Sequence, residues 1–344
     1  MSGKKKISYP IDLEFKVGKP TFFGGAEDKY TIHKQEVDKI IELMNGIFRV
    51  GYVKRDRNFC HGINAHSLNE AVRERLKQVD GIEGETDVVF GSFLPPIHSK
   101  GEFDFSIYDK DTNFYNLWNH CYGKEAVRNG DEIIEYCIRD DKTSNEWLAF
   151  IEKQKPKKYK ENLQIQSDAD VFNIIGEIQF GNWAMVYKDM FRLVSAINKK
   201  AKIDLYVYVA ADGNLKKLMS DGVVGFEDAC KRFKENVENH NINRPVMILP
   251  LDVAFDLDTF DFSAAEEGYI SICDEISKIE KKIETCKKEI KKEQLKKKEC
   301  KETANELKKI KDKINRFKKK KQAEEQRLAE VKNMYKIQNE FDEE

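Results

Sequence analysis

Residues 163–211 read LQIQSDADVFNIIGEIQFGNWAMVYKDMFRLVSAINKKAKIDLYVYVAA and carry the most informative pattern in the chain. The segment IIGEIQF (174–180) has the apolar run of a buried strand, and KIDLYVYVA (202–210) is a second apolar strand. Between them, WAMVYKDMFRLVSAI (183–197) has its apolar residues at helical spacing. A strand, a helix and a strand in succession predict an α/β core with a central mixed β-sheet flanked by helices.

The flanking sequence extends this pattern in both directions. A helix is predicted from Ser67 to Val79, with Ser67 as its N-cap, because Glu70 three residues later completes a capping box. The other expected elements are helices at 34–45 and 225–236, a strand at 246–251, strands and a loop over 85–108, and a lysine-rich surface excursion over 140–162.

The C-terminal segment has a different character. No Gly or Pro follows Gly268, and apolar side chains recur at heptad spacing. Residues 278–321 hold 20 Lys/Arg and 8 Asp/Glu, a net charge of +12, whereas the whole chain has a net charge of −1. Residues 267–344 are therefore predicted to be a charged coiled coil or a folded-back helical hairpin, separate from a domain over 1–266. The heptad positions are Ile272, Ile276, Ile279, Ile283, Cys286 and Ile290.

Composition restricts the compartment. The seven cysteines are odd in number and show no CxxC spacing, which favours a reducing environment. The N-terminus, MSGKKKISYP, is followed by no apolar stretch, and the chain has no run of 18 apolar residues. A cytoplasmic protein without a membrane segment is expected.

Acidic residues interrupt the apolar segment at the centre of the pattern. If the chain turns at Phe172-Asn173 and forms a hairpin, Asp168 lies opposite Glu177, and Gln179 shares their face. Two carboxylates and an amide oxygen suit a hard cation such as Mg²⁺, which can polarise a phosphate and activate a water molecule. Asp168 and Glu177 are the predicted metal ligands, and these two with Gln179 are the predicted catalytic residues.

The sequence GEIQFGNWAMVYKDMFR (176–192) resembles the active-site strand and the following helix of BglII-like type II restriction endonucleases. That family has the signature Asp, about nine residues, then Glu-x-Gln, a variant of the PD-(D/E)XK nuclease signature in which Gln replaces Lys. Asp168, Glu177 and Gln179 match it. Asp170 is the alternative aspartate, because SDAD offers two candidates.

The resemblance implies a restriction-endonuclease-like core and a Mg²⁺-dependent endonuclease that cuts double-stranded DNA and leaves 5′-phosphate ends. It also implies a palindromic site, a homodimer and a DNA methyltransferase as the genetic partner in a restriction-modification system. Two alternatives stay open, a structure-specific or repair nuclease and a non-catalytic coiled-coil DNA-binding scaffold. A neighbouring methyltransferase gene would favour the first reading.

Base reading requires side chains that reach the edges of bases in a groove. By resemblance, the loop after the catalytic strand contributes Asn182, which can bond adenine with both amide atoms. A second reading loop is expected over 210–222. Its candidates are Asn214, Ser220 and Asp221 for bases and Lys216 and Lys217 for phosphates.

Overall fold

The computed structural model describes residues 8–55, 61–96, 101–126, 129–164, 172–239, 242–299 and 304–334. Asp168 and Asp170 lie outside these residues. The chain divides into a larger unit, Leu13–Phe48 with Ala65–Thr259, and a smaller unit, Met1–Asp12 with Arg49–Asn64 and Phe260–Glu344.

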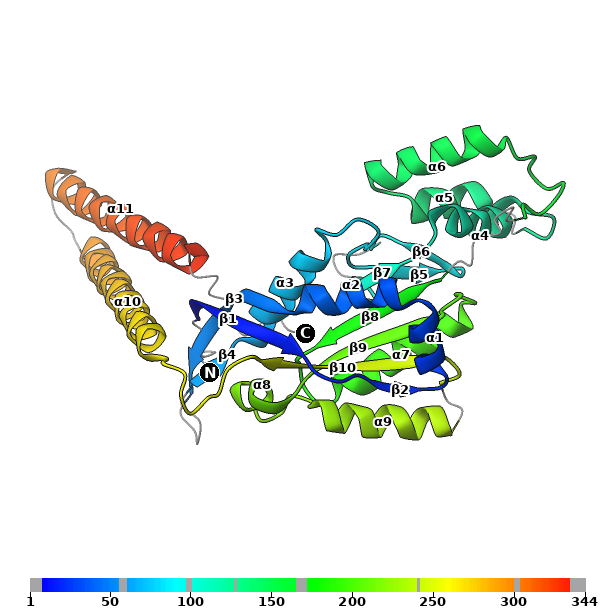
Figure 1. The fold of residues 1–344 in the computed structure, drawn as a ribbon. Coiled ribbons are helices and arrows are strands. Elements are labelled where there is room, and N and C mark those ends of the chain that lie inside the picture. Colours follow the sequence, from blue (N-terminus) through cyan, green and yellow to red (C-terminus); the bar gives the residue numbers. More distant parts are fainter. Residues whose placement is uncertain are drawn as a thin grey trace. The chain divides into compact units, whose positions relative to one another are not determined.

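The elements follow one another in the order drawn in Figure 1. The strands are β1 (Tyr9–Val17), β2 (Thr21–Phe23), β3 (Gly46–Lys54), β4 (His61–Ile63), β5 (Asp87–Val89), β6 (Ser92–Leu94), β7 (Phe105–Ile107), β8 (Ile174–Gln179), β9 (Leu205–Ala211) and β10 (Val246–Val253). The helices are α1 (Ala26–Ile32), α2 (Lys34–Met44), α3 (Ala65–Leu76), α4 (Lys110–Tyr122), α5 (Gly130–Cys137), α6 (Asp141–Gln154), α7 (Met185–Asn198), α8 (Gly213–Leu218), α9 (Phe226–Glu238), α10 (Ser263–Glu299) and α11 (Ala304–Met334).

The larger unit is built on a mixed sheet. β8, β9 and β10 are parallel neighbours, and Tyr208 of β9 pairs with Glu177 on one side and Ile248 on the other. β7 is antiparallel to β8, while β1 and β2 are antiparallel to β10. The expected α/β core with a mixed sheet and helices is confirmed.

Helices α7 and α9 cover one face of this sheet. Ile175, Tyr206 and Ile248 point to that face from three strands and share a core cluster with Leu193 of α7 and Phe233 of α9. Side chains two residues apart in a strand share a face. Glu177 and Gln179, which follow Ile175 at this spacing, therefore face α7.

Local periodicity located most elements correctly, and two details differ. α3 begins at Ala65, so Ser67 lies inside the helix and the predicted N-cap is wrong. The 140–162 segment is largely the helix α6, because Trp147 and Phe150 give it an apolar face that packs on α4. With α5, these helices form an aromatic cluster of their own between β7 and β8 in the chain order.

In the smaller unit, α10 and α11 pack against each other. Ile272, Ile276 and Ile279 are buried in a cluster with Val331 of α11, and Arg327 is 2.9 Å from Glu275. The two helices therefore lie against each other within the described residues, and the choice between a coiled coil and a folded-back hairpin stays a prediction. The boundary predicted after residue 266 falls inside α10 and also stays a prediction.

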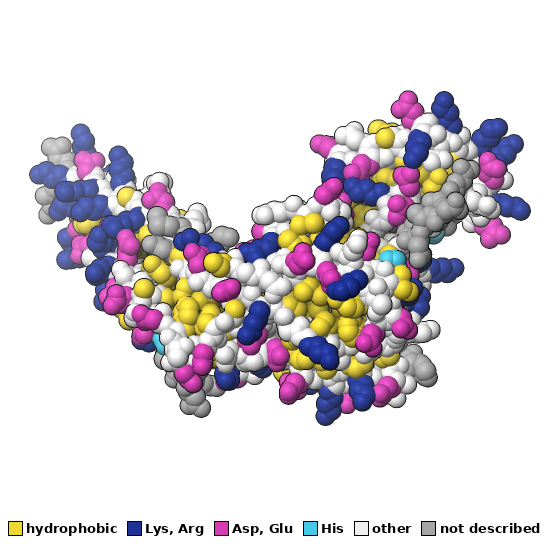
Figure 2. Space-filling model, in the orientation of Figure 1, with side chains coloured by type: hydrophobic (Ala, Val, Ile, Leu, Met, Phe, Trp, Pro, Cys, Tyr) yellow, Lys and Arg dark blue, Asp and Glu magenta, His cyan; other side chains and the backbone are white. Residues whose placement is uncertain are grey.

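The surface over α10 and α11 is crowded with Lys and Arg side chains (Figure 2). Both helices are highly charged on their exposed sides, which explains why the apolar seam is narrow. Within the described residues, no helix has the length and apolar character needed to cross a membrane.

Candidate active site

Strand β8 holds the Glu-x-Gln sequence, and it does not pair with the segment that was predicted beside it. β7 pairs with it on one side and β9 on the other. Both edges of β8 are therefore occupied, and the hairpin predicted between residues 163–171 and this strand is wrong. Asp168 lies outside the described residues, so its role as a ligand stays a prediction, but the pairing that selected it is lost.

The acid beside Glu177 is Asp104. β7 begins at Phe105, which pairs with Gly176, and Asp104 directly precedes the strand, close enough to Glu177 for its carboxyl group to raise the pKa of Glu177. The Asp104 amide donates to the Gly176 carbonyl (3.0 Å), and the Ile178 amide donates to Asp104 Oδ2 (2.7 Å). Asp104 and Glu177 are 6% and 3% exposed, so two buried carboxylates face each other on one side of the sheet.

Asp104 was missed by the sequence interpretation, although the sequence carries a signal for it. In EFDFSIY (102–108) an acid stands between two phenylalanines, both of which are buried. A charge inside a buried strand is costly and therefore informative. Glu177 is recognisable in the sequence for the same reason, because it lies within the apolar segment IIGEIQF.

Gln179 is held by groups on both sides. Its Nε2 donates to Asp189 Oδ2 (2.8 Å), and its Oε1 accepts from the Gly181 amide (2.7 Å). Asp189 lies on α7 and is fully buried, and the Tyr208 hydroxyl donates to the same Oδ2 at 3.5 Å. Asp189 therefore fixes which way the Gln179 amide points.

Two arginines neutralise part of this acidic cluster. Arg192 Nη1 donates to Glu177 Oε1 (3.1 Å) and lies 3.5 Å from Asp189 Oδ1. Arg73 on α3 pairs with Asp104 and, at 3.4 Å, with Glu85. Burial, with repulsion from Asp104 and Asp189, raises the pKa of Glu177 well above its usual value, and Arg192 opposes this. Burial also raises the pKa of Asp189 to about 6.

The acidic oxygen donors at this site are Asp104 and Glu177, two carboxylates of the kind that hard divalent cations prefer. In the part of the chain that the structure describes, no group of three or more His, Cys, Asp and Glu side chains could hold a metal ion. A cation would depend on Asp104 and Glu177, supplemented by amide and main-chain oxygens such as those of Gln179. Mutual repulsion of the buried acids is the feature that a divalent cation would relieve.

The two predicted reading loops lie side by side. Asn182 forms a bridge with Val223, and the Trp183 amide donates to the Gly222 carbonyl (2.8 Å). Asn182 is exposed, and its Oδ1 accepts from the Ala184 amide at 3.1 Å. Both loops follow the carboxyl ends of parallel strands, the edge where α/β sheets commonly bind ligands.

The second loop contains the short helix α8, and its candidates differ in exposure. Asn214 donates to the Phe255 carbonyl (3.3 Å) and accepts from Lys217 (3.1 Å), so it connects parts of the fold. Lys217, Ser220 and Asp221 are exposed. Lys216 is half-buried, and burial lowers its pKa.

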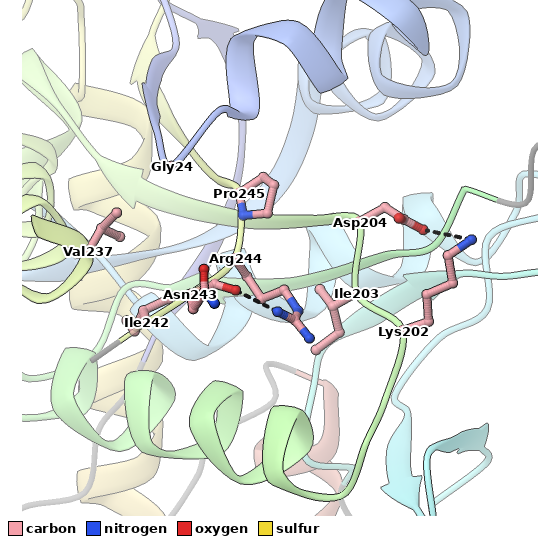
Figure 3. A pocket seen from close by; sticks show the side chains of 9 residues that line it. All are labelled: Gly24, Lys202, Ile203, Asp204, Val237, Ile242, Asn243, Arg244 and Pro245. Atoms are coloured by element: carbon pink, nitrogen blue, oxygen red, sulfur yellow. Dashed lines mark hydrogen bonds and ion pairs between the residues drawn. The ribbon is translucent and has the colours of Figure 1, made fainter. Parts of the chain in front are cut away.

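A cavity of about 430 Å³ opens at the other edge of the parallel strands (Figure 3). It adjoins the amino ends of β9 and β10, where Lys202 pairs with Asp204 (3.9 Å) and Arg244 donates to the Asn243 carbonyl (2.6 Å). None of its lining residues belongs to the acidic cluster. The cavity is therefore separate from the candidate active site.

No family model and no curated protein matches the chain. Among solved structures it is similar to restriction endonuclease BglII complexed with a DNA 16-mer, with 10% identity, a TM-score of 0.36 and coverage of 70% of this chain and 78% of that chain. It is also similar to free BglII, with 10% identity, a TM-score of 0.35 and coverage of 71% and 82%.

Proposed function

We propose that this protein is a Mg²⁺-dependent type II site-specific endonuclease that hydrolyses phosphodiester bonds in double-stranded DNA. The observation that carries the proposal is the position of Asp104 beside Glu177, where both carboxyl groups are buried, with Gln179 on the same face. In this proposal Asp104 has the role of metal ligand that the sequence predicts for Asp168. The exposed loops at the carboxyl ends of β8 and β9 would contact the DNA.

Each side chain has a definable task. Asp104 and Glu177 would hold the metal ion, which when bound supplies charge stabilisation at the phosphate and an activated water molecule. Gln179, oriented by Asp189 and Gly181, would present its carbonyl oxygen beside them. Arg73 holds Asp104 in place because it pairs with the carboxylate oxygen that Ile178 does not use.

The finer features belong to the same proposal. A palindromic site, 5′-phosphate ends, a homodimer, and a methyltransferase partner in a restriction-modification system follow from the Glu-x-Gln resemblance. A twofold dimer would place one such site on each DNA strand.

The test is digestion of phage DNA by the purified full chain with Mg²⁺, followed by mapping of the cut ends. Glu177→Ala is expected to abolish cleavage and to leave DNA binding largely intact. Glu102→Ala is the matched control, because Glu102 pairs with Lys199 and contacts none of the cluster. Cuts at one repeated sequence support the proposal, whereas cuts only at branched or damaged DNA indicate a repair nuclease. Binding without any cleavage indicates the scaffold alternative.

A further inference from the structure

Arg192 is the one group that contacts both Glu177 and Asp189 among the ion pairs of the described residues. Its Nη1 is 3.1 Å from Glu177 Oε1 and 3.5 Å from Asp189 Oδ1. The Arg192 side chain is 27% exposed, whereas the two carboxylates it contacts are buried. A single guanidinium thus bridges an acid on β8 and an acid on α7.

The carboxylates of Glu177 and Asp189 differ in the hydrogen bonds that they accept. Glu177 Oε1 receives a hydrogen bond from Arg192. Asp189 Oδ1 is buried and has no hydrogen-bond partner among the described residues, although Asp189 Oδ2 accepts from Gln179 and Tyr208. A buried carboxylate oxygen without a hydrogen bond is costly, so it marks a place where a donor would be favourable.

Arg192 is also the donor best placed to reach that oxygen. Asp189 and Arg192 stand three residues apart on α7, a spacing at which side chains on a helix face meet. A charged hydrogen bond is about 2.7–2.9 Å long, so a shift of well under ~1 Å converts the present contact into one.

We propose that Arg192 competes with the divalent cation for Glu177 and that Asp189 receives the guanidinium when the cation binds. This inference rests on the proposed function. A cation bound at Glu177 Oε1 and the Arg192 guanidinium repel each other, so each weakens the binding of the other there. Asp189 acts as a positioning residue twice, because it orients the Gln179 amide and holds the displaced Arg192.

The test is calorimetric titration of the full chain with Mn²⁺ in the absence of DNA, which does not depend on cleavage. Arg192→Gln should bind Mn²⁺ about tenfold more tightly than the wild type, since one competing charged hydrogen bond is lost. Arg327→Gln, which removes an arginine–glutamate pair on the hairpin, is the matched control and should leave the affinity unchanged. Arg192→Met, which also removes the charge, gives a second variant if the glutamine form does not fold, and its affinity should likewise lie above that of the wild type.

A double-mutant cycle separates the role of Asp189. Asp189→Asn should weaken Mn²⁺ binding in the wild type, and its effect should be smaller by about threefold or more in the Arg192→Gln background. Equal effects in both backgrounds would overturn the receiving role of Asp189. Unchanged or weaker binding by Arg192→Gln would overturn the competition while leaving the proposed function standing. If the wild-type chain binds no Mn²⁺ at all, both the proposed competition and the proposed metal-dependent function would be overturned.

Discussion

Asp104 is anchored through both carboxylate oxygens, one by the Ile178 amide and the other by Arg73. Asp104→Asn replaces one acceptor oxygen with an amide and removes the charge opposite Glu177. Cleavage should fall by roughly a hundredfold or more, the scale for losing a ligand or its close support at a metal site. The measurement is the single-turnover rate on a cognate fragment at saturating Mg²⁺.

Asp168→Asn and Asp170→Asn are the comparisons for this variant. Both should cut faster than Asp104→Asn, because the Asp104 carboxyl group lies beside Glu177. The opposite order of rates would return the metal site to the SDAD segment.

Asn182 offers a test of base reading. Its exposed side chain lies in the loop that bridges to Val223. Asn182→Ala should weaken binding to the cognate site by about 1–3 kcal/mol, the worth of a two-point contact with a base. Binding to random DNA should hardly change, since phosphates supply that part of the affinity. Equal losses on both DNAs, measured by fluorescence anisotropy, would exclude a base-reading role.

The site residues that the sequence could identify are those that act within one element. Glu177, Gln179 and Asn182 belong to one strand and the loop after it, so their spacing is visible in the chain. Asp104 and Glu177 are 73 positions apart (177 − 104) and meet only because β7 pairs with β8. Asp189 and Arg192 looked like ordinary polar positions of an amphipathic helix, since their acidic partners lie on β8 and cannot be seen from helical periodicity.

At the scale of elements, the pairing of β7 with β8 depends on Gly176. A Cβ built there would overlap the ring of Phe105, which is fully buried. Gly176→Ala should therefore destabilise the protein by about 1–3 kcal/mol, the usual cost of overpacking, and displace β7 together with Asp104, which directly precedes it. Chemical denaturation measures the first effect and the cleavage rate the second.

Phe105→Leu tests the cause of that loss. Combined with Gly176→Ala, it should recover part of the stability, so the double variant should be more stable than the sum of single effects predicts. Strict additivity would show that the glycine is needed for another reason.

Strands and helices were predictable because their apolar periods are local. The 4-3-4 spacing in α10 and the apolar runs of β8 and β9 required no knowledge of their neighbours. The predicted hairpin failed because strand pairing is a non-local choice. The chain inserts α4, α5 and α6 between β7 and β8, the two strands that pair. The aromatic residues of these helices pack against one another in a cluster of their own.

At the scale of the whole molecule, the excess of basic residues and the candidate active site belong to different units. The acidic cluster is in the larger unit, while the basic excess lies on α10 and α11. Replacing Lys318, Lys319, Lys320 and Lys321 by glutamine should weaken DNA binding and make it less sensitive to salt. Each lost phosphate contact reduces the slope of log K against log salt by about 0.9. The matched control replaces the same four residues by arginine, and an unchanged slope in the glutamine form would mean that this basic run faces only solvent.

The insertion of α4, α5 and α6 also determines how the molecule can be divided. The segment after α6 includes Tyr159, which is 53% exposed, and a single nick there would leave Asp104 and Arg73 on one fragment. Glu177, Gln179 and Arg192 would be on the other, so neither fragment alone contains both carboxylates. Cleavage of DNA would then require that the two fragments reassociate through β7 and β8, and the protein would behave as a split enzyme whose activity reports the proximity of its halves.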